Sequence, residues 1–218
     1  MNWESIVISA VVIVIFIAIL GAYLRSQKNV RVGIQGEKKV AGILKRFAGI
    51  RSFKVINDIY LPLYDKTTQL DHILIGFFGM IVIETKNYKG DIYGAPKDKE
   101  WLHVVGDEKN KFYNPIMQNQ THIDAIRHIF AKEKIYNINI DSLIVFTGGR
   151  KSHLYIPKNL PVIKLRKLKK VLHKSAYEKD NDVDVEKLYN TLMEHRVTDP
   201  KLIANHNKNV KKMAKRNK

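Results

Sequence analysis

The sequence predicts an α/β protein: a mixed central sheet between helices, preceded by an apolar helix and followed by a basic helical region. Three observations predict this fold class. Residues 70–75 and 80–85 are rich in β-branched residues and are joined by a short connection that contains two glycines. Apolar residues at helical spacing precede and follow this pair. Residues 142–147 form a near-continuous apolar run, typical of a strand that is buried on both faces and covered by helices.

The length and composition of the chain limit the classes of function that it can have. A chain of 218 residues fits one domain with appendages. The chain contains no cysteine, which excludes disulfides and thiolate zinc sites and fits a reducing compartment. A formal net charge of +17 favours a polyanionic partner, either nucleic acid, an anionic membrane surface or both. The sequence has neither a glycine-rich phosphate loop nor a nucleophilic serine elbow.

The N-terminal region predicts a membrane anchor. Residues 5–24 carry no charged side chain, and at about 1.5 Å per residue such a helix spans roughly the 30 Å of a bilayer core. Glu4 precedes it, where a secretory signal peptide would carry positive charge. Arg25, Lys28 and Arg31 follow it, and this positive bias predicts that the rest of the chain faces the cytoplasm. A buried helix of a globular core is the alternative.

The glycine-flanked connection sets the register of the predicted hairpin. If residues 77 and 78 form the turn, Gly76 pairs with Gly79, and Asp71 then lies opposite Glu84. Directly opposed residues share one face of the sheet, and Lys86 returns to that face two residues later. A slip of one residue would place Asp71 on the other face.

This arrangement predicts a metal site. Two opposed carboxylates repel each other unless a cation lies between them. Mg²⁺ or Mn²⁺ bound by Asp71 and Glu84 would suit phosphodiester hydrolysis, with Lys86 orienting the attacking water or stabilising charge on the phosphate. The alternative is structural: Glu84 and Lys86 form a solvated strand end, and Asp71 is a turn residue.

Three segments around these residues carry a family resemblance: QLDHILIG, FGMIVIETKNYKGDIYG and NPIMQNQTH. They resemble the NERD (nuclease-related domain) family, a branch of the PD-(D/E)xK nuclease-like superfamily, over residues 32–149. The resemblance implies a restriction-endonuclease-like three-layer core and a metal-dependent catalytic site that contains Asp71, Glu84 and Lys86. It also implies a helical glutamate that assists metal binding, matched by Glu37, and a supporting glutamine, matched by Gln118.

The remaining elements follow from local patterns. Residues 33–47 predict a helix with Val40, Leu44 and Phe47 on its apolar face. Residues 53–61 predict a strand that ends at Pro62. We expect short strands at 91–94 and 101–105, a polar turn at 106–110 and a helix that begins at Asn114-Pro115. The predicted organisation is a short N-terminal segment (1–4), a transmembrane helix (5–24), a basic juxtamembrane linker (25–32), the nuclease-like domain (33–150) and a basic C-terminal extension (151–218).

Several residues near the proposed site predict contacts with nucleic acid. Tyr88 and Lys89 occupy a turn just after Lys86, where a ring can stack on a base and an ammonium can contact a phosphate. Gln118 and His122 are spaced i, i+4 and share one helix face. We therefore expect His122 to lie on the same side as the proposed site and to approach a phosphate of the substrate. A plain exposed turn and a polar helix face are the alternatives.

The C-terminal region is strongly basic. Residues 164–174 contain six Lys or Arg and no acid, and they predict a basic amphipathic helix that includes Lys169 and Lys170. A mixed-charge helix is expected at 184–196, followed by a frayed tail that includes Lys211 and Lys212. These lysines would contact phosphates independently of sequence, or anionic lipid beneath the anchor. A solvated basic face is the alternative.

Together these features predict a membrane-anchored nuclease that faces the cytoplasm and hydrolyses DNA or RNA with Mg²⁺ or Mn²⁺. Two other classes of function stay open. A nucleic-acid-binding or membrane-tethering module would keep the nuclease fold without turnover, and an adaptor would recruit proteins through its basic helices.

Overall fold

The computed structural model describes residues 2–216, and it divides the chain into two compact units, Met1–Gln35 and Gly36–Lys218. The side chains of residues 5, 25, 26, 28–30, 211 and 213–216 lie outside the description.

The first unit consists of most of helix α1, which runs from Trp3 to Gly49. Its stretch Ile6–Leu24 is 19 residues long and fully exposed, and it has the length and apolar composition to cross a membrane. A signal sequence has the same properties, so the helix fits either an anchor or a signal sequence. The expected linker at 25–32 is helical, and the side chains of Arg25 and Lys28 lie outside the described residues.

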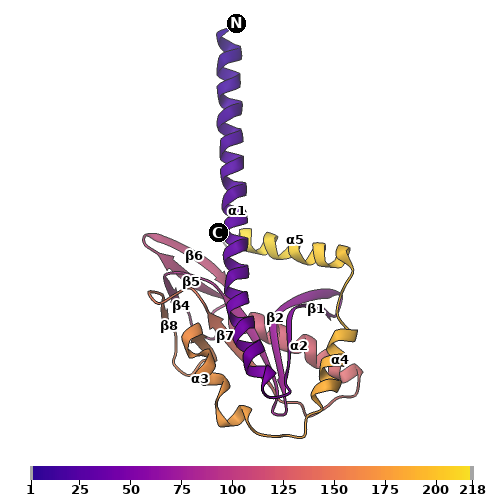
Figure 1. Ribbon diagram of the computed structural model, residues 1–218. Coiled ribbons are helices and arrows are strands. Elements are labelled where there is room, and N and C mark those ends of the chain that lie inside the picture. The colour runs from indigo at the N-terminus through magenta and orange to yellow at the C-terminus, as the bar shows by residue number, and fades with distance from the viewer. Residues whose placement is uncertain (1, 217–218) are drawn as a thin grey trace. The chain divides into compact units, whose positions relative to one another are not determined.

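The second unit is built on a mixed sheet of five strands in the order β1-β2-β3-β7-β9. Figure 1 labels β1, β2 and β7 of this sheet. The strands are β1 (Lys54–Leu63), β2 (Lys66–Gly76), β3 (Gly79–Lys86), β7 (Ile140–Phe146) and β9 (Val162–Lys164). The first three strands are antiparallel, and β7 and β9 are parallel to their neighbours. The expected end of the first strand at Pro62 is wrong, because Pro62 pairs with Thr67 within the ladder. Strand β1 lies at the edge of the sheet, where proline is tolerated because the N–H that it lacks is not needed to pair with a further strand.

Helices lie against both faces of this sheet. On one face, Ile123, Ile126 and Ile129 of α2 (Pro115–Lys132) pack in a core cluster with Leu188 and Leu192 of α4 (Val185–Glu194). On the other face, Val40 and Leu44 of α1 pack with Leu168 and Leu172 of α3 (Leu168–Leu172). The α/β class and the mixed sheet are therefore as predicted.

A second mixed sheet contains four short strands in the order β6-β5-β4-β8. Its strands are β4 (Asp91–Tyr93), β5 (Glu100–Val105), β6 (Glu108–Tyr113) and β8 (His153–Tyr155). The sequence indicated the first two of these strands, but not β8, which pairs in parallel with β4. Buried Ile92 and Trp101 join this sheet to Ile144 and Phe146 of β7.

The basic C-terminal region is less continuous than expected. Its first part is divided among β9, a 3₁₀ turn (Leu165–Lys167) and the five residues of α3. A second 3₁₀ turn covers Ser175–Tyr177. The final helix, α5 (Pro200–Arg216), is docked through His206, whose Nδ1 lies 2.7 Å from the carbonyl oxygen of Thr67. The N-terminal part of the expected tail is thus an ordered helix against β2.

Candidate active site

The hairpin of β2 and β3 has the predicted register. Its ladder runs from Gly76 opposite Gly79 to His72 opposite Ile83, so the next residues along the two strands are Asp71 and Glu84. The backbone N–H of Thr85 donates a hydrogen bond of 2.8 Å to Asp71 Oδ2, which ties the two strands together beyond the ladder. Burial raises the pKa of Asp71 well above its usual range, and the negative charge of Glu84 raises it further.

Glu84 is the most enclosed carboxylate of the site, since the residue is only 2% exposed. Its Oε1 lies 2.8 Å from Lys86 Nζ, and its Oε2 lies 3.2 Å from His122 Nε2. Burial alone would raise the pKa of Glu84, but the Lys86 ammonium and the hydrogen bond from His122 lower it to about 2. Glu84 is therefore a carboxylate at physiological pH, stabilised by two neighbouring donors.

Lys86 joins β3 to helix α2. Besides its ion pair with Glu84, its Nζ donates a hydrogen bond of 2.9 Å to Gln118 Oε1. Burial would lower the pKa of Lys86, but the charge of Glu84 outweighs this effect and raises it. Asn114 begins α2 as its N-cap and accepts from the Ile116 N–H at 2.9 Å, which fixes the turn that carries Gln118. Gln118, the supporting glutamine that the family resemblance implied, thus contacts Lys86 directly.

His122 does not lie where the phosphate-contact prediction required. It is 4% exposed, and its Nδ1 lies 2.7 Å from Thr68 Oγ1 while its Nε2 faces Glu84. A carboxylate only accepts hydrogen bonds, so Nε2 donates to Glu84, and the Thr68 hydroxyl is the hydrogen-bond partner of Nδ1. The correction is that His122 holds Glu84 in place from α2 and is too enclosed to reach a nucleic-acid strand.

Glu37 approaches the site from α1. It is half-buried, and its pKa is raised by burial, then by the charges of Asp58 and Glu84. The preceding Gly36 permits this approach, because a Cβ there would lie 2.6 Å from Thr147 Oγ1 and 2.8 Å from Asn87 Cβ.

Asp58 is an acidic residue that the sequence analysis did not single out. It lies on β1 between the ladder pairs Asn57–His72 and Ile59–Leu70, and the residue at the matching position of β2 is Asp71. Its φ of 52° is in the left-handed region, and its Oδ1 accepts a hydrogen bond of 2.7 Å from Gln69 Nε2. In the sequence, the one feature that could have indicated Asp58 is that it is an acidic residue within an apolar strand pattern. His72 is the residue next to Asp71 on β2, and its Nδ1 lies 2.7 Å from Asn57 Oδ1.

The turn after β3 packs against the second sheet. The Tyr88 ring stacks on His103 with centroids 4.7 Å apart, and His103 Nε2 also contacts the Lys89 carbonyl oxygen. One face of Tyr88 is therefore already covered, whereas the Lys89 side chain is exposed. The other predicted nucleic-acid contacts are on different elements: Lys169 and Lys170 are exposed on α3, Lys212 is exposed on α5, and the side chain of Lys211 lies outside the described residues.

Gly148 allows this turn to approach β7, and its replacement is expected to destabilise the domain. A Cβ at Gly148 would lie 1.4 Å from the carbonyl oxygen of Tyr88, so Gly148→Ala must displace backbone. Overpacking of this kind typically costs about 1–3 kcal/mol. Urea unfolding of the two proteins measures the difference, with Gly42→Ala as the control, because a Cβ at Gly42 would meet no atom within 4 Å. Equal destabilisation by both substitutions would contradict the close approach.

The donor set at the site fits a hard divalent cation. Asp71 and Glu84 supply carboxylate oxygens, the ligands that Mg²⁺ prefers, and their mutual repulsion is relieved by positive charge. Within the part of the chain that the structure describes, no group of three or more His, Asp or Glu side chains is arranged to hold a metal ion. Asp71 and Glu84 would supply two carboxylate ligands to a metal, and the other coordination positions would be open to water or phosphate oxygens, as is common for Mg²⁺.

Comparison with known families places this α/β domain among nuclease-related proteins. Residues 32–147 match the family model described as NERD, the nuclease-related domain. The chain belongs to the NERD family, as its motifs predicted.

An uncharacterized protein of Bacillus anthracis is 38% identical to this chain over 102 residues. The match covers 46% of this chain and 48% of the relative, so the chain spans about half the length of the curated relative that it matches. No solved structure matches the chain.

Proposed function

We propose that this protein is a membrane-anchored, metal-dependent nuclease with a restriction-endonuclease-like core. The observation that carries the proposal is the contact network at the end of the hairpin. Asp71 and Glu84 occupy corresponding positions on β2 and β3, and the Lys86 ammonium lies between Glu84 at 2.8 Å and Gln118 at 2.9 Å. Membership of the nuclease-related family supports the same chemistry.

Asp71 and Glu84 would hold Mg²⁺ or Mn²⁺, with Glu37 adding negative charge alongside them. When bound, such an ion neutralises charge on the phosphate and makes a coordinated water more acidic. The resemblance to the family motif at Asp71, Glu84 and Lys86 and the chemistry of the two carboxylates both support this assignment.

The other residues of the network have separate tasks. The ion pair with Glu84 keeps Lys86 protonated, so its ammonium is suited to donate to a phosphate oxygen and to stabilise the charge that develops there. Gln118 orients that ammonium by accepting one of its hydrogens. His122 positions Glu84 by donating to Oε2, and Thr68 fixes the ring of His122 in turn.

We further propose that residues 5–24 anchor the protein in the membrane and that the domain faces the cytoplasm. The exposed apolar helix and the basic residues that follow it support this orientation. DNA or RNA is the proposed substrate, and exposed lysines such as Lys89, Lys170 and Lys212 would contact its phosphates or anionic lipid.

One observation favours a second candidate, a nucleic-acid-binding or tethering module without turnover. Both oxygens of Glu84 already have partners, in Lys86 and His122. A metal would have to share Glu84 with these donors. If it does not, the network is a structural element that closes the end of the hairpin.

Cleavage assays with the full chain in detergent micelles distinguish the two candidates. The substrates are labelled single- and double-stranded DNA and RNA, each incubated with Mg²⁺, Mn²⁺ or EDTA. We expect cleavage with either metal and none with EDTA. Salt-sensitive binding of the same strands without cleavage in any metal would support the module and contradict the nuclease.

A further inference from the structure

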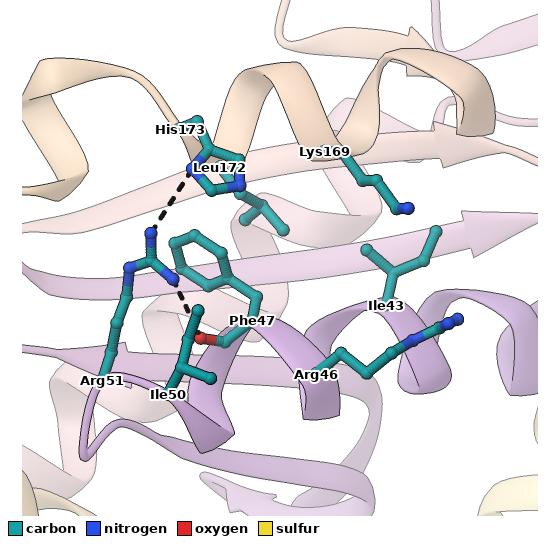
Figure 2. A pocket seen from close by; sticks show the side chains of 8 residues that line it. All are labelled: Ile43, Arg46, Phe47, Ile50, Arg51, Lys169, Leu172 and His173. Carbon is teal, nitrogen blue, oxygen red and sulfur yellow. Dashed lines mark hydrogen bonds between the residues drawn. The ribbon is translucent and has the colours of Figure 1, made fainter.

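A small cavity with a basic rim lies between the C-terminal end of α1 and helix α3. Its volume is about 190 Å³, and its lining contains none of the proposed catalytic residues. Buried Phe47 and Leu172 form part of an apolar floor. Figure 2 shows Arg51 and His173 together on one side, with Lys169 and Arg46 on the other.

The charge of this cavity is unbalanced. Arg46, Arg51 and Lys169 line it together with His173, and no carboxylate does. Across the described residues, none of these three cations has an ion-pair partner. By contrast, Lys54 lies 2.6 Å from Glu186 and Lys86 lies 2.8 Å from Glu84. Cations that converge without a counterion repel one another, and a bound anion would relieve that repulsion.

Arg51 is held over the ring of Phe47. Its guanidinium carbon lies 4.1 Å from the centroid of the Phe47 ring, and its Nη1 donates to the Phe47 carbonyl oxygen at 3.4 Å. Its Nη2 lies 3.4 Å from His173 Nδ1. Since arginine only donates, Nδ1 accepts, and the neutral ring of His173 then carries its proton on Nε2. The cavity thus contains a fixed planar cation beside a histidine N–H donor.

The other two cations retain free donors. Among the described residues, the one hydrogen bond of the Arg46 side chain runs from its Nε to the Gly42 carbonyl oxygen at 3.1 Å, and the two terminal nitrogens of the guanidinium can donate to a ligand. Lys169 is exposed and carries three N–H donors. Donors from two different elements therefore surround one concavity, which is the arrangement that phosphate groups favour.

We propose that this cavity binds a single nucleotide, with the phosphate on the basic rim and the base against the Arg51–Phe47 stack. Guanidinium planes and aromatic rings are common stacking partners of bases. The volume is below the roughly 300–1,000 Å³ of sites for drug-sized ligands, so the cavity would enclose only part of one nucleotide and has no room for a dinucleotide. This site does not involve Asp71 or Glu84 and does not depend on the proposed cleavage.

Titration calorimetry of the full chain in detergent micelles with adenosine monophosphate tests the proposal. EDTA is present, so that no metal at the carboxylates contributes. We expect binding at low salt, no detectable binding of adenosine, and weaker binding of inorganic phosphate. Lys169→Gln and Arg46→Gln should each weaken binding about tenfold or more, because each removes a charge-assisted hydrogen bond.

The chain offers matched controls for both variants. Lys45 neighbours Arg46 but lines a different cavity, and exposed Lys174 lies close to Lys169 in sequence but outside the lining. Lys45→Gln and Lys174→Gln remove the same charge and should change binding less than about twofold, since general attraction to exposed charge is weak. Equal losses in all four variants, tight binding of adenosine, or no binding of the monophosphate would overturn the proposal. So would binding of phosphatidylglycerol vesicles that is lost only in the cavity variants, with no nucleotide binding, because the occupant would then be a lipid headgroup.

Discussion

Replacing Lys86 with alanine is expected to reduce cleavage about 10²–10³-fold while leaving nucleic-acid binding largely unchanged. The Lys86 ammonium is held between Glu84 and Gln118 and is the cation best placed to stabilise charge on a phosphate. Removal of one such preorganised donor typically costs this much in kcat. Single-turnover cleavage and filter binding of the same labelled strand measure the two effects separately.

Lys89→Ala is the matched control, because Lys89 is exposed in the turn three residues later. We expect Lys89→Ala to weaken binding modestly and to make binding slightly less sensitive to salt than in the wild type. Cleavage of the bound strand should be unchanged. Cleavage by Lys86→Ala at the wild-type rate would show that Lys86 has a structural role alone.

Replacing Glu84 with glutamine is expected to destabilise the domain by about 3–5 kcal/mol. The Lys86–Glu84 pair is enclosed, with side-chain exposures of 17% and 3%. Loss of the carboxylate leaves a buried ammonium without its counterion, which is far more costly than the loss of a surface pair. Urea unfolding in EDTA, followed by the fluorescence of buried Trp101, measures the change.

Glu186→Gln provides the comparison for this prediction. Its pair with Lys54 is just as short, at 2.6 Å, but the side chains are 38% and 63% exposed. We expect a change of about 0–1 kcal/mol there, because water screens the exposed charges. Similar values for the two variants would contradict the account of Glu84 as a carboxylate fixed in a buried network.

The hairpin and its carboxylates were predictable from sequence because their geometry is set locally. Two glycines flank the connection, and this fixes the register that places Asp71 beyond His72 and Glu84 beyond Ile83. The family pattern indicated Gln118 as a residue that supports the site, and the structure shows its direct hydrogen bond to Lys86.

Other features depend on contacts between distant parts of the chain, and local patterns do not encode them. Strand β8 pairs with β4 across about sixty residues, so its three residues carry little signal of their own. The burial of His122 depends on how closely α2 packs against Thr68 and Glu84, whereas the sequence shows only its spacing from Gln118. Asp58 joins the acidic group only through the register of β1 with β2.

Binding of Mn²⁺ tests the central claim, that Asp71 and Glu84 hold a divalent metal ion for catalysis, without requiring the right substrate. Electron paramagnetic resonance of free Mn²⁺ during titration with the full chain in neutral detergent reports the bound ion. We predict one site that is lost in Asp71→Asn and retained in Asp65→Asn, which removes a carboxylate from the turn between β1 and β2. Equal Mn²⁺ binding by Asp71→Asn and the wild type, or none by either, would contradict the proposed metal site.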